Sequence, residues 1–195
     1  MANCIILSGG TQSPDGWCTV KRSLGPYRLA SALEDAGYTT FVLDYVENLT
    51  KEEIVKAINP HIDESTLWFG FSSTFFWGLQ KKYTNARTAN DDLSSMYYAE
   101  YSDIEYVIDF VKFKSNAKIL YGGAKAPYFS LNDVDKNIDY YVTGNADNSV
   151  IDITDFLAGK KESILHLDNR TVDSFKYPEP EITNISTRWW NYPII

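Results

Sequence analysis

Short apolar runs alternate with helical segments along most of this 195-residue chain, and this alternation limits its fold more than any other feature. Residues 3–8 form an apolar run that ends at paired glycines, which is typical of a strand buried on both faces of a parallel sheet. Four further strands are predicted at residues 39–46, 66–72, 117–121 and 138–143.

Helix signals separate these strands. A helix over residues 25–37 begins near Pro26 and stops at a glycine. Capping-box sequences open two further helices at residues 50 and 102, and Asn148 is expected to cap the last one. Strands and helices in this alternation, joined by right-handed crossovers, predict an α/β fold.

The predicted architecture is a doubly wound, five-stranded parallel sheet with the flavodoxin-like strand order 2-1-3-4-5. We expect residues 1–159 to form this domain. The pattern changes after residue 159, so residues 160–195 are expected to form a C-terminal arm or linker.

The composition excludes several classes of function. Lys and Arg total 18 against 26 Asp and Glu, and the net charge of -8 argues against binding to nucleic acid or to an anionic membrane. No apolar run approaches the roughly 18 residues of a membrane span, and no signal peptide is expected. Cys4 and Cys18 are the only cysteines, too few for an iron–sulfur cluster on this chain, and they favour a cytoplasmic location.

Small and hydroxylated residues follow four of the predicted strands. Ligands of an open parallel sheet bind at the carboxyl ends of its strands, so we expect these residues to share one edge. Together they would form a shallow ledge on which a flat or bulky ligand approaches the backbone closely. The alternative is that glycine and serine are simply the ordinary residues of such turns. The candidate cofactor-binding residues are Ser8, Gly9, Gly10, Ser72, Ser73, Thr74, Gly122, Gly123, Gly144 and Asn145.

Common catalytic motifs are absent from the sequence. Neither a G-x-G-x-x-G fingerprint nor a Walker loop follows any strand. Residues 70–74 lack the second glycine of a nucleophile elbow, so Ser72 is not expected to be a hydrolase nucleophile. His61 and His166 are the only imidazoles and lie far apart in the chain, so no metal site is expected. We therefore expect no catalytic residues.

Four segments together resemble one family, the N-terminal cobalamin (B12)-binding domain of radical S-adenosylmethionine (SAM) enzymes. Residues 25–44 are similar to the family's first helix and second strand, and residues 69–75 to its serine-bearing third-strand end. Residues 121–124 (YGGA) are similar to its fourth-strand glycine pair, and residues 142–147 stand in the place of its V-x-G-E-G-E turn. The likeness covers residues 3–158.

The resemblance implies a corrin ring on the carboxyl edge of the sheet, with the cobalamin tail between the first and third strand ends. On this analogy the serines after the third strand contact the tail, the glycine pair lets it pass, and Gly144 and Asn145 border its base. The D-x-H-x-x-G loop, which supplies a cobalt ligand in other cobalamin proteins, is absent. The resemblance therefore implies a corrinoid held without a protein histidine.

The C-x-x-x-C-x-x-C motif and the radical barrel are also absent from the sequence. The resemblance thus implies a module that is not catalytic alone and serves a radical SAM methyltransferase-type enzyme, whose barrel acts in trans or was lost by truncation. The apolar terminus with Trp189, Trp190 and Tyr192 would either fold back over the domain or dock on that barrel.

Two other functions are compatible with the residues. One is an FMN-binding, flavodoxin-like electron carrier, whose phosphate would bind at the hydroxyl-rich loop after the first strand. The other is an interaction domain that has kept the fold without a ligand.

Overall fold

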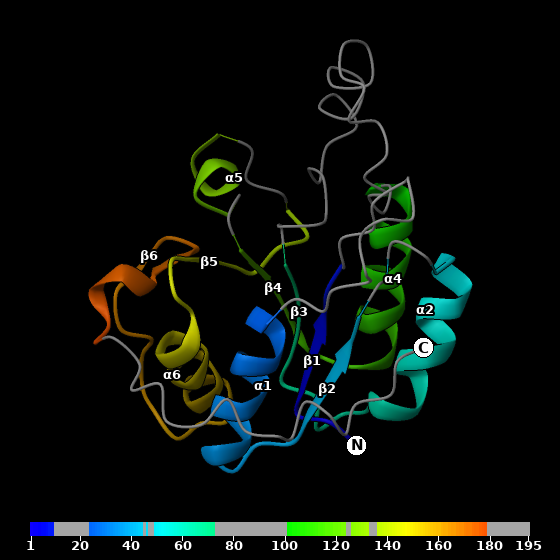
Figure 1. The fold of residues 1–195 in the computed structure, drawn as a ribbon, viewed down its shortest axis with the longest axis horizontal. Coiled ribbons are helices and arrows are strands. Elements are labelled where there is room, and N and C mark those ends of the chain that lie inside the picture. The colour runs from blue at the N-terminus through cyan, green and yellow to red at the C-terminus, as the bar shows by residue number, and fades with distance from the viewer. Residues whose placement is uncertain are drawn as a thin grey trace, which may run out of the picture.

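The computed structural model describes residues 1–9, 24–44, 46, 49–72, 101–123, 126–132 and 136–178. These residues form an α/β fold in which helices cover both faces of one sheet (Figure 1). The strands are β1 (Cys4–Leu7), β2 (Thr40–Leu43), β3 (Trp68–Ser72), β4 (Lys118–Gly122), β5 (Tyr140–Thr143), β6 (Leu167–Asp168) and β7 (Thr171–Asp173). The helices are α1 (Leu24–Asp35), α2 (Lys51–Ile58), α4 (Tyr101–Lys114), α5 (Ala126–Asn132) and α6 (Asp147–Leu157), with 3-10 turns η2 (Asn59–His61) and η3 (Ser174–Lys176).

Within the described residues the sheet has seven strands in the order β2-β1-β3-β4-β5-β7-β6. The first five follow the predicted order 2-1-3-4-5, and all their pairings are parallel. Strand β7 adds in parallel to β5, and β6 pairs antiparallel with β7. The predicted five-stranded parallel sheet is therefore extended at this edge by two short strands. Strands β6 and β7 are short and largely polar, so no apolar run marks them in the sequence.

The segment that follows α6 packs on the domain. Ile164 and Val172 are buried in the core on the α1/α6 face. Asp152 of α6 accepts hydrogen bonds from the Leu165 amide and from the Tyr177 hydroxyl, each at 2.7 Å. Residues 160–177 are therefore attached to the sheet by strand pairing, burial and hydrogen bonds.

The remainder of the C-terminal segment, residues 179–195, lies outside the described residues. This range includes Trp189, Trp190 and Tyr192, so their docking on a partner stays a prediction. The domain boundary at residue 159 stays a prediction as well.

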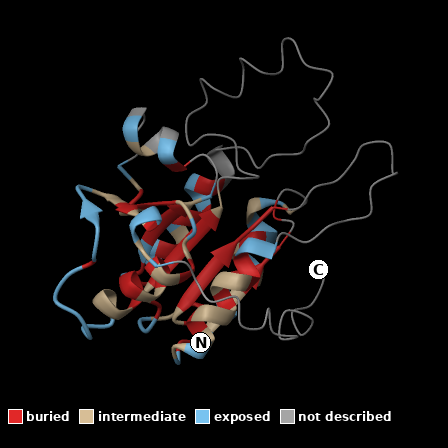
Figure 2. Cartoon of the chain, turned by 60° about the vertical axis from the view of Figure 1, so that its left-hand side comes forward, coloured by how far each residue is buried: buried red, intermediate tan, exposed pale blue. Residues whose placement is uncertain are grey.

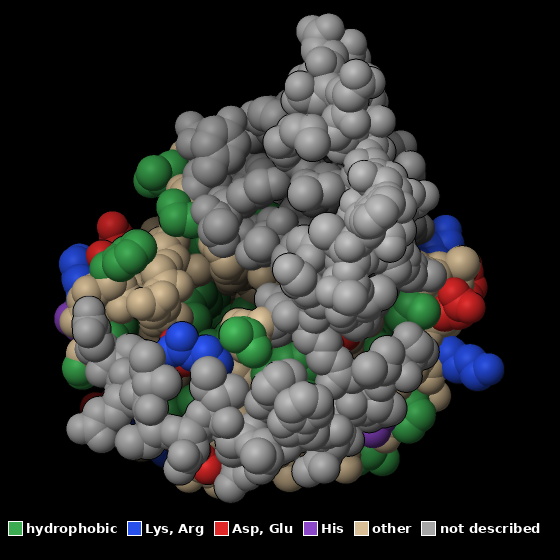
Figure 3. Space-filling view, viewed as in Figure 1, with side chains coloured by type: hydrophobic (Ala, Val, Ile, Leu, Met, Phe, Trp, Pro, Cys, Tyr) green, Lys and Arg blue, Asp and Glu red, His purple; other side chains and the backbone are tan. Residues whose placement is uncertain are grey.

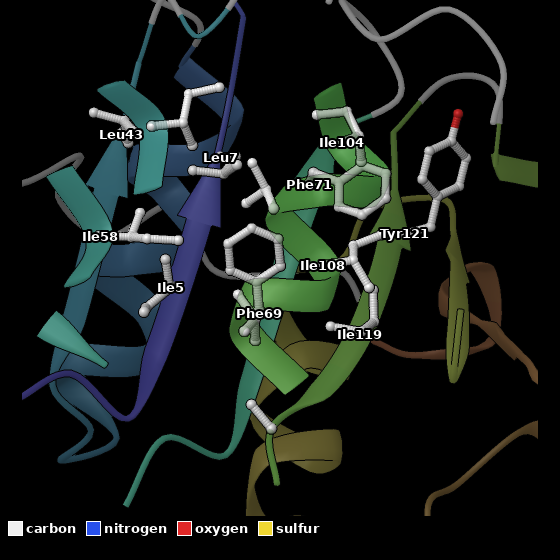
Figure 4. Packing of buried hydrophobic residues seen from close by; sticks show 14 of the residues in the cluster. Ile5, Leu7, Leu43, Ile58, Phe69, Phe71, Ile104, Ile108, Ile119 and Tyr121 are labelled. Carbon is white, nitrogen blue, oxygen red and sulfur yellow. The ribbon is translucent and has the colours of Figure 1, made fainter. Parts of the chain in front are cut away.

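Alternate strand residues point to opposite faces of the sheet and build two cores. Ile5, Phe69 and Ile119 pack with buried residues of α2 and α4 (Figure 4). Ile6 and Leu120 pack with buried residues of α1 and α6 on the other face. Buried residues are concentrated along the strands and the inward sides of the helices (Figure 2).

The helix starts agree with the sequence in one case and differ in another. The predicted capping box at Thr50 is confirmed: its hydroxyl accepts from the Glu53 amide at 3.2 Å, and the Glu53 carboxylate accepts from the Thr50 amide at 2.8 Å. The residue that caps α6 is Ala146, which makes no side-chain capping bond, so the prediction of Asn148 is wrong. Asn148 donates instead to the Pro178 carbonyl at 2.8 Å.

No helix among the described residues combines the length and the apolar character that a membrane crossing requires.

Candidate functional site

A slot opens on one face of the sheet, where β3, β4 and β5 meet helices α1 and α6. Its volume is about 230 Å³. The described surface is hollowed in this region, with hydrophobic side chains inside the hollow (Figure 3). The shallow ledge expected across the strand tips is thus corrected to a slot on one face, because α1 and α6 enclose it from the sides.

Glycines form much of the slot floor. Gly70 of β3, Gly122 of β4 and Gly144 after β5 all line it. A Cβ built on Gly122 would meet only Val142, at 3.8 Å from its carbonyl oxygen and 3.9 Å from its Cβ. A Cβ at Gly122 would therefore make only ordinary van der Waals contacts, and a side chain at this position would extend into the slot.

Trp68 closes the slot toward the amino end of β3. Its indole ring covers Gly70, because a Cβ at that glycine would lie 2.8 Å from Trp68 Cζ3. The indole Nε1–H donates to Thr154 Oγ1 at 2.8 Å, which fixes the ring against α6. The ring is fully buried. One wall of the slot is thus a rigid aromatic plane.

The helices supply the other walls with small and apolar side chains. Pro26 and Leu29 line the slot from α1, and Val150 lines it from α6. The hydroxyl of buried Tyr27 donates to Asp44 Oδ2, which ties α1 to the end of β2. This bond holds the α1 wall in place.

The charged side chains in the described lining of the slot come from α1 and α6, which pack against each other. Arg28 Nε and Nη2 are each 3.0 Å from Asp147 Oδ1, and both residues line the slot. Ser72 and Asn145 are the other polar side chains in the lining. The lining is therefore mostly apolar, with one paired cation and anion that join the two helices.

The structure brings together candidate residues from three strand ends. The predicted residues that line the slot are Ser72, Gly122, Gly123, Gly144 and Asn145. Gly123 and Gly144 have φ angles of 93° and 86°, a left-handed conformation that favours glycine.

The remaining predicted site residues are not in the slot lining. Ser8 and Gly9 are buried at the end of β1, where Ser8 Oγ donates to the Gly9 carbonyl at 3.2 Å. Gly10, Ser73 and Thr74 lie outside the described residues. A cofactor-binding role for any of the predicted residues stays a prediction.

Sequence reasoning did not single out the other lining residues as site residues, among them Gly70, Arg28 and Asp147. A glycine inside an apolar strand often marks a close approach of backbone or ligand, and that signal could have identified Gly70. The Arg28–Asp147 ion pair joins residues 119 positions apart, so no local sequence pattern predicts it.

The described residues could contribute shape and hydrogen bonds to ligand binding, and they provide few reactive side chains. Burial raises the pKa of the Cys4 thiol to about 12, so this cysteine is a neutral core residue. His61 stacks on Phe41 with ring centroids 3.8 Å apart, outside the slot lining. No cluster of three or more metal-ligating side chains is present in the described part of the chain.

The fold and the slot thus define an α/β protein with a candidate ligand site at the carboxyl ends of a mostly parallel sheet. No protein-family model matches the sequence, and no curated protein matches it.

Several solved structures are similar to the chain. Radical SAM methyltransferase TsrM from Kitasatospora setae, with cobalamin and a [4Fe-4S] cluster bound, has 14% identity and a TM-score of 0.47, covering 83% of this chain and 25% of that chain. The cobalamin-dependent SAM radical enzyme OxsB, with aqua-cobalamin bound, has 17% identity and a TM-score of 0.48, covering 82% of this chain and 19% of that chain.

This chain spans a quarter or less of the length of these two enzymes. They belong to the class that the sequence motifs resemble. The likeness is one of fold at low identity, and it says nothing about the slot.

Proposed function

We propose that this chain is a corrinoid-binding module, like the front domain of radical SAM enzymes, whose slot holds the base of the cobalamin nucleotide tail. The observation that carries the proposal is the open floor at Gly122, where a planar ring can lie directly on main-chain atoms. The sequence resemblance to cobalamin-binding domains supports the same ligand.

The size of the slot supports binding of the tail rather than of the whole cofactor. Its volume of about 230 Å³ is smaller than the roughly 300–1,000 Å³ of pockets that enclose a drug-sized ligand. A planar base fits such a volume, whereas a corrin ring would have to lie outside it. The slot would therefore anchor the cofactor by its tail.

Bound cobalamin supplies group-transfer and radical chemistry at its cobalt. This chain's own residues would bind and orient the tail: Pro26, Leu29 and Val150 remove water from the base, and Ser72 places a hydroxyl in the lining. The cobalt would have no protein imidazole ligand, as the absence of the D-x-H-x-x-G loop from the sequence implies. The radical SAM barrel would come from another chain or from a further part of a longer one.

The proposal is tested by comparing hydroxocobalamin with cobinamide, a corrinoid that lacks the nucleotide base. Binding is followed by the visible absorbance retained on the protein after gel filtration and by titration. We expect the protein to retain cobalamin and to bind cobinamide at least about tenfold more weakly, which corresponds to about 1.4 kcal/mol.

Gly122→Val is the informative variant, because its side chain would enter the slot while the strand is preserved. It should bind cobalamin no better than cobinamide. Lys118→Val is the matched control: it places the same residue in β4, at an exposed position outside the slot lining.

Three results would contradict the proposal. These are wild-type protein that stays colourless, equal affinity for the two corrinoids, and a Gly122→Val variant that keeps the preference. A yellow protein that retains FMN would support the electron-carrier alternative. A protein that binds neither cofactor would support the ligand-free interaction domain.

A further inference from the structure

Arg28 is the only positively charged side chain among the described residues that line the slot. It belongs to α1, which the hydrogen bond between Tyr27 and Asp44 ties to the end of β2. The Arg28 side chain is 32% exposed, so it is partly withdrawn from water but still accessible. In a mostly apolar pocket a few polar groups fix the orientation of the ligand. Arg28 is therefore the described lining residue best suited to an anionic part of a ligand.

The ion pair with Asp147 engages one edge of the Arg28 guanidinium group and leaves another edge open. Nε and Nη2 are each 3.0 Å from the same oxygen, Asp147 Oδ1, so the carboxylate lies on the side edge of the group. The end edge, formed by Nη1 and the second hydrogen of Nη2, has no acceptor among the described residues. Two parallel N–H donors on such an edge match two oxygens of a phosphate group.

The strength of this interaction follows from the charges of the two side chains. Arg28 and Asp147 together carry no net charge, so the pair exerts little long-range attraction on an anion. An anion that reaches the end edge of Arg28 gains short, charge-assisted hydrogen bonds instead. The cation is also the more exposed partner, at 32% against 13% for the carboxylate. We therefore expect directed binding of moderate strength at Arg28.

We infer that the end edge of Arg28 binds the phosphate of the cobalamin nucleotide tail, while the base of the tail lies on the glycine floor of the slot. The inference rests on the proposed function, because base and phosphate belong to the same tail. It adds a specificity-determining residue, through which the slot prefers a ring that carries a phosphate to the same ring without one.

The test uses two probes that contain the base and ribose of the tail. One is α-ribazole, which has no phosphate, and the other is its 3′-methylphosphate diester, which adds one negative charge. Dissociation constants are measured by NMR titration of the folded protein at pH 7.5. We expect the wild-type protein to bind the diester about tenfold more tightly than α-ribazole, as for hydrogen bonds to a charged group.

Two variants of Arg28 separate the effect of its planar edge from that of its charge. Arg28→Gln removes both, so it should bind the two probes equally and bind α-ribazole as the wild type does. Arg28→Lys keeps the charge without the planar edge and should retain only part of the preference. Lys56→Gln is the matched control, because it removes one positive charge from an exposed position of α2, on the opposite face of the sheet. The full preference should persist in this control.

The outcomes distinguish this inference from the proposed function. Equal binding of the two probes by the wild type, full preference in either Arg28 variant, or an equal loss of both probes in Arg28→Gln would overturn the phosphate subsite. The slot would then remain a site for the base alone. If neither probe binds, the phosphate subsite is overturned, and the proposed function fails with it only if cobalamin is not retained either.

Discussion

The indole ring of Trp68 occupies the space in which a side chain on Gly70 would stand, with Cζ3 2.8 Å from the Cβ position. Gly70→Ala should therefore overpack a buried strand and lower the free energy of unfolding by about 1–3 kcal/mol. Gly122→Ala, whose Cβ would meet nothing closer than 3.8 Å, should change it by less than about 1 kcal/mol. Urea unfolding of the two variants measures both values, and similar losses would contradict this account of the slot floor.

Thr154 accepts the hydrogen bond of the Trp68 indole at 2.8 Å inside the core. Thr154→Val keeps the shape but removes the acceptor, leaving a buried N–H group without its partner. We expect a loss of about 1–3 kcal/mol in the free energy of unfolding. Thr154→Ser retains the hydroxyl and should lose less. A loss in Thr154→Ser as large as that in Thr154→Val would show that the methyl group contributes as much as the hydrogen bond, and would contradict this prediction.

Asp152 joins α6 to the segment that follows it. Its carboxylate, which is 3% exposed, accepts hydrogen bonds from Lys161 Nζ at 2.5 Å, the Leu165 amide at 2.7 Å and the Tyr177 hydroxyl at 2.7 Å. Asp152→Asn should lower the free energy of unfolding at pH 7 by about 2–3 kcal/mol, as for lost hydrogen bonds to a buried charge. Chemical denaturation measures the loss, and the more exposed Asp155→Asn serves as the control.

The same carboxylate gives a pH-dependent signature. Burial acts to raise the pKa of Asp152, but the hydrogen bonds from Lys161, Tyr177 and Leu165 outweigh it and hold this pKa below its ordinary value. A carboxylate with a lowered pKa stabilises the fold above the unfolded pKa of about 3.9 and loses this contribution as the pH falls through its folded pKa. The stability gap between wild type and Asp152→Asn should therefore be constant from pH 7 to 5 and shrink below pH 4. A gap that stayed constant below pH 4 would contradict the assignment.

The stability also depends on pH through His61, at higher pH than through Asp152. Burial, with a smaller effect from the N-terminal amino group, lowers the pKa of His61 below 6.5, so the folded state holds the ring neutral. The unfolded chain then binds a proton more readily as the pH falls below about 6.5, and stability decreases in that range. His61→Gln should lose less stability than wild type between pH 7.5 and 5.5, as measured by thermal or urea unfolding. Parallel losses would rule out this contribution.

Much of the fold follows from local pattern. The residues of α1 and the apolar runs of β1 to β5 carry propensity and periodicity signals, so the elements and their order could be predicted. The bounds and pairing of β6 and β7 could not be predicted, because a two-residue strand such as Leu167–Asp168 exists through its pairing and not through its own sequence. The N-cap of α6 at Ala146 could not be predicted either. Asn148 is the better capping residue by type, but its side chain donates a hydrogen bond to the Pro178 carbonyl instead.

The candidate site was predicted in part. The residues after β3, β4 and β5 were recognised because small residues at strand ends are visible in sequence. The enclosure of the slot by α1 and α6 could not be predicted, since it depends on how Trp68 and the helices fill the space above the sheet. The Arg28–Asp147 pair depends on tertiary folding alone.

The pairing of β7 with β5, and of β6 with β7, also decides how this flank of the sheet meets other molecules. A longer β5 at the margin would present a row of open amide and carbonyl groups on which a foreign strand could assemble. Among the described residues the outermost strand on this side consists of Leu167 and Asp168, flanked by His166 and Asn169, both at φ 54°. Because this edge strand is so short and its flanking residues bend the backbone sharply, it offers almost no template for intermolecular strand addition. This reduces the tendency to aggregate along this side of the sheet.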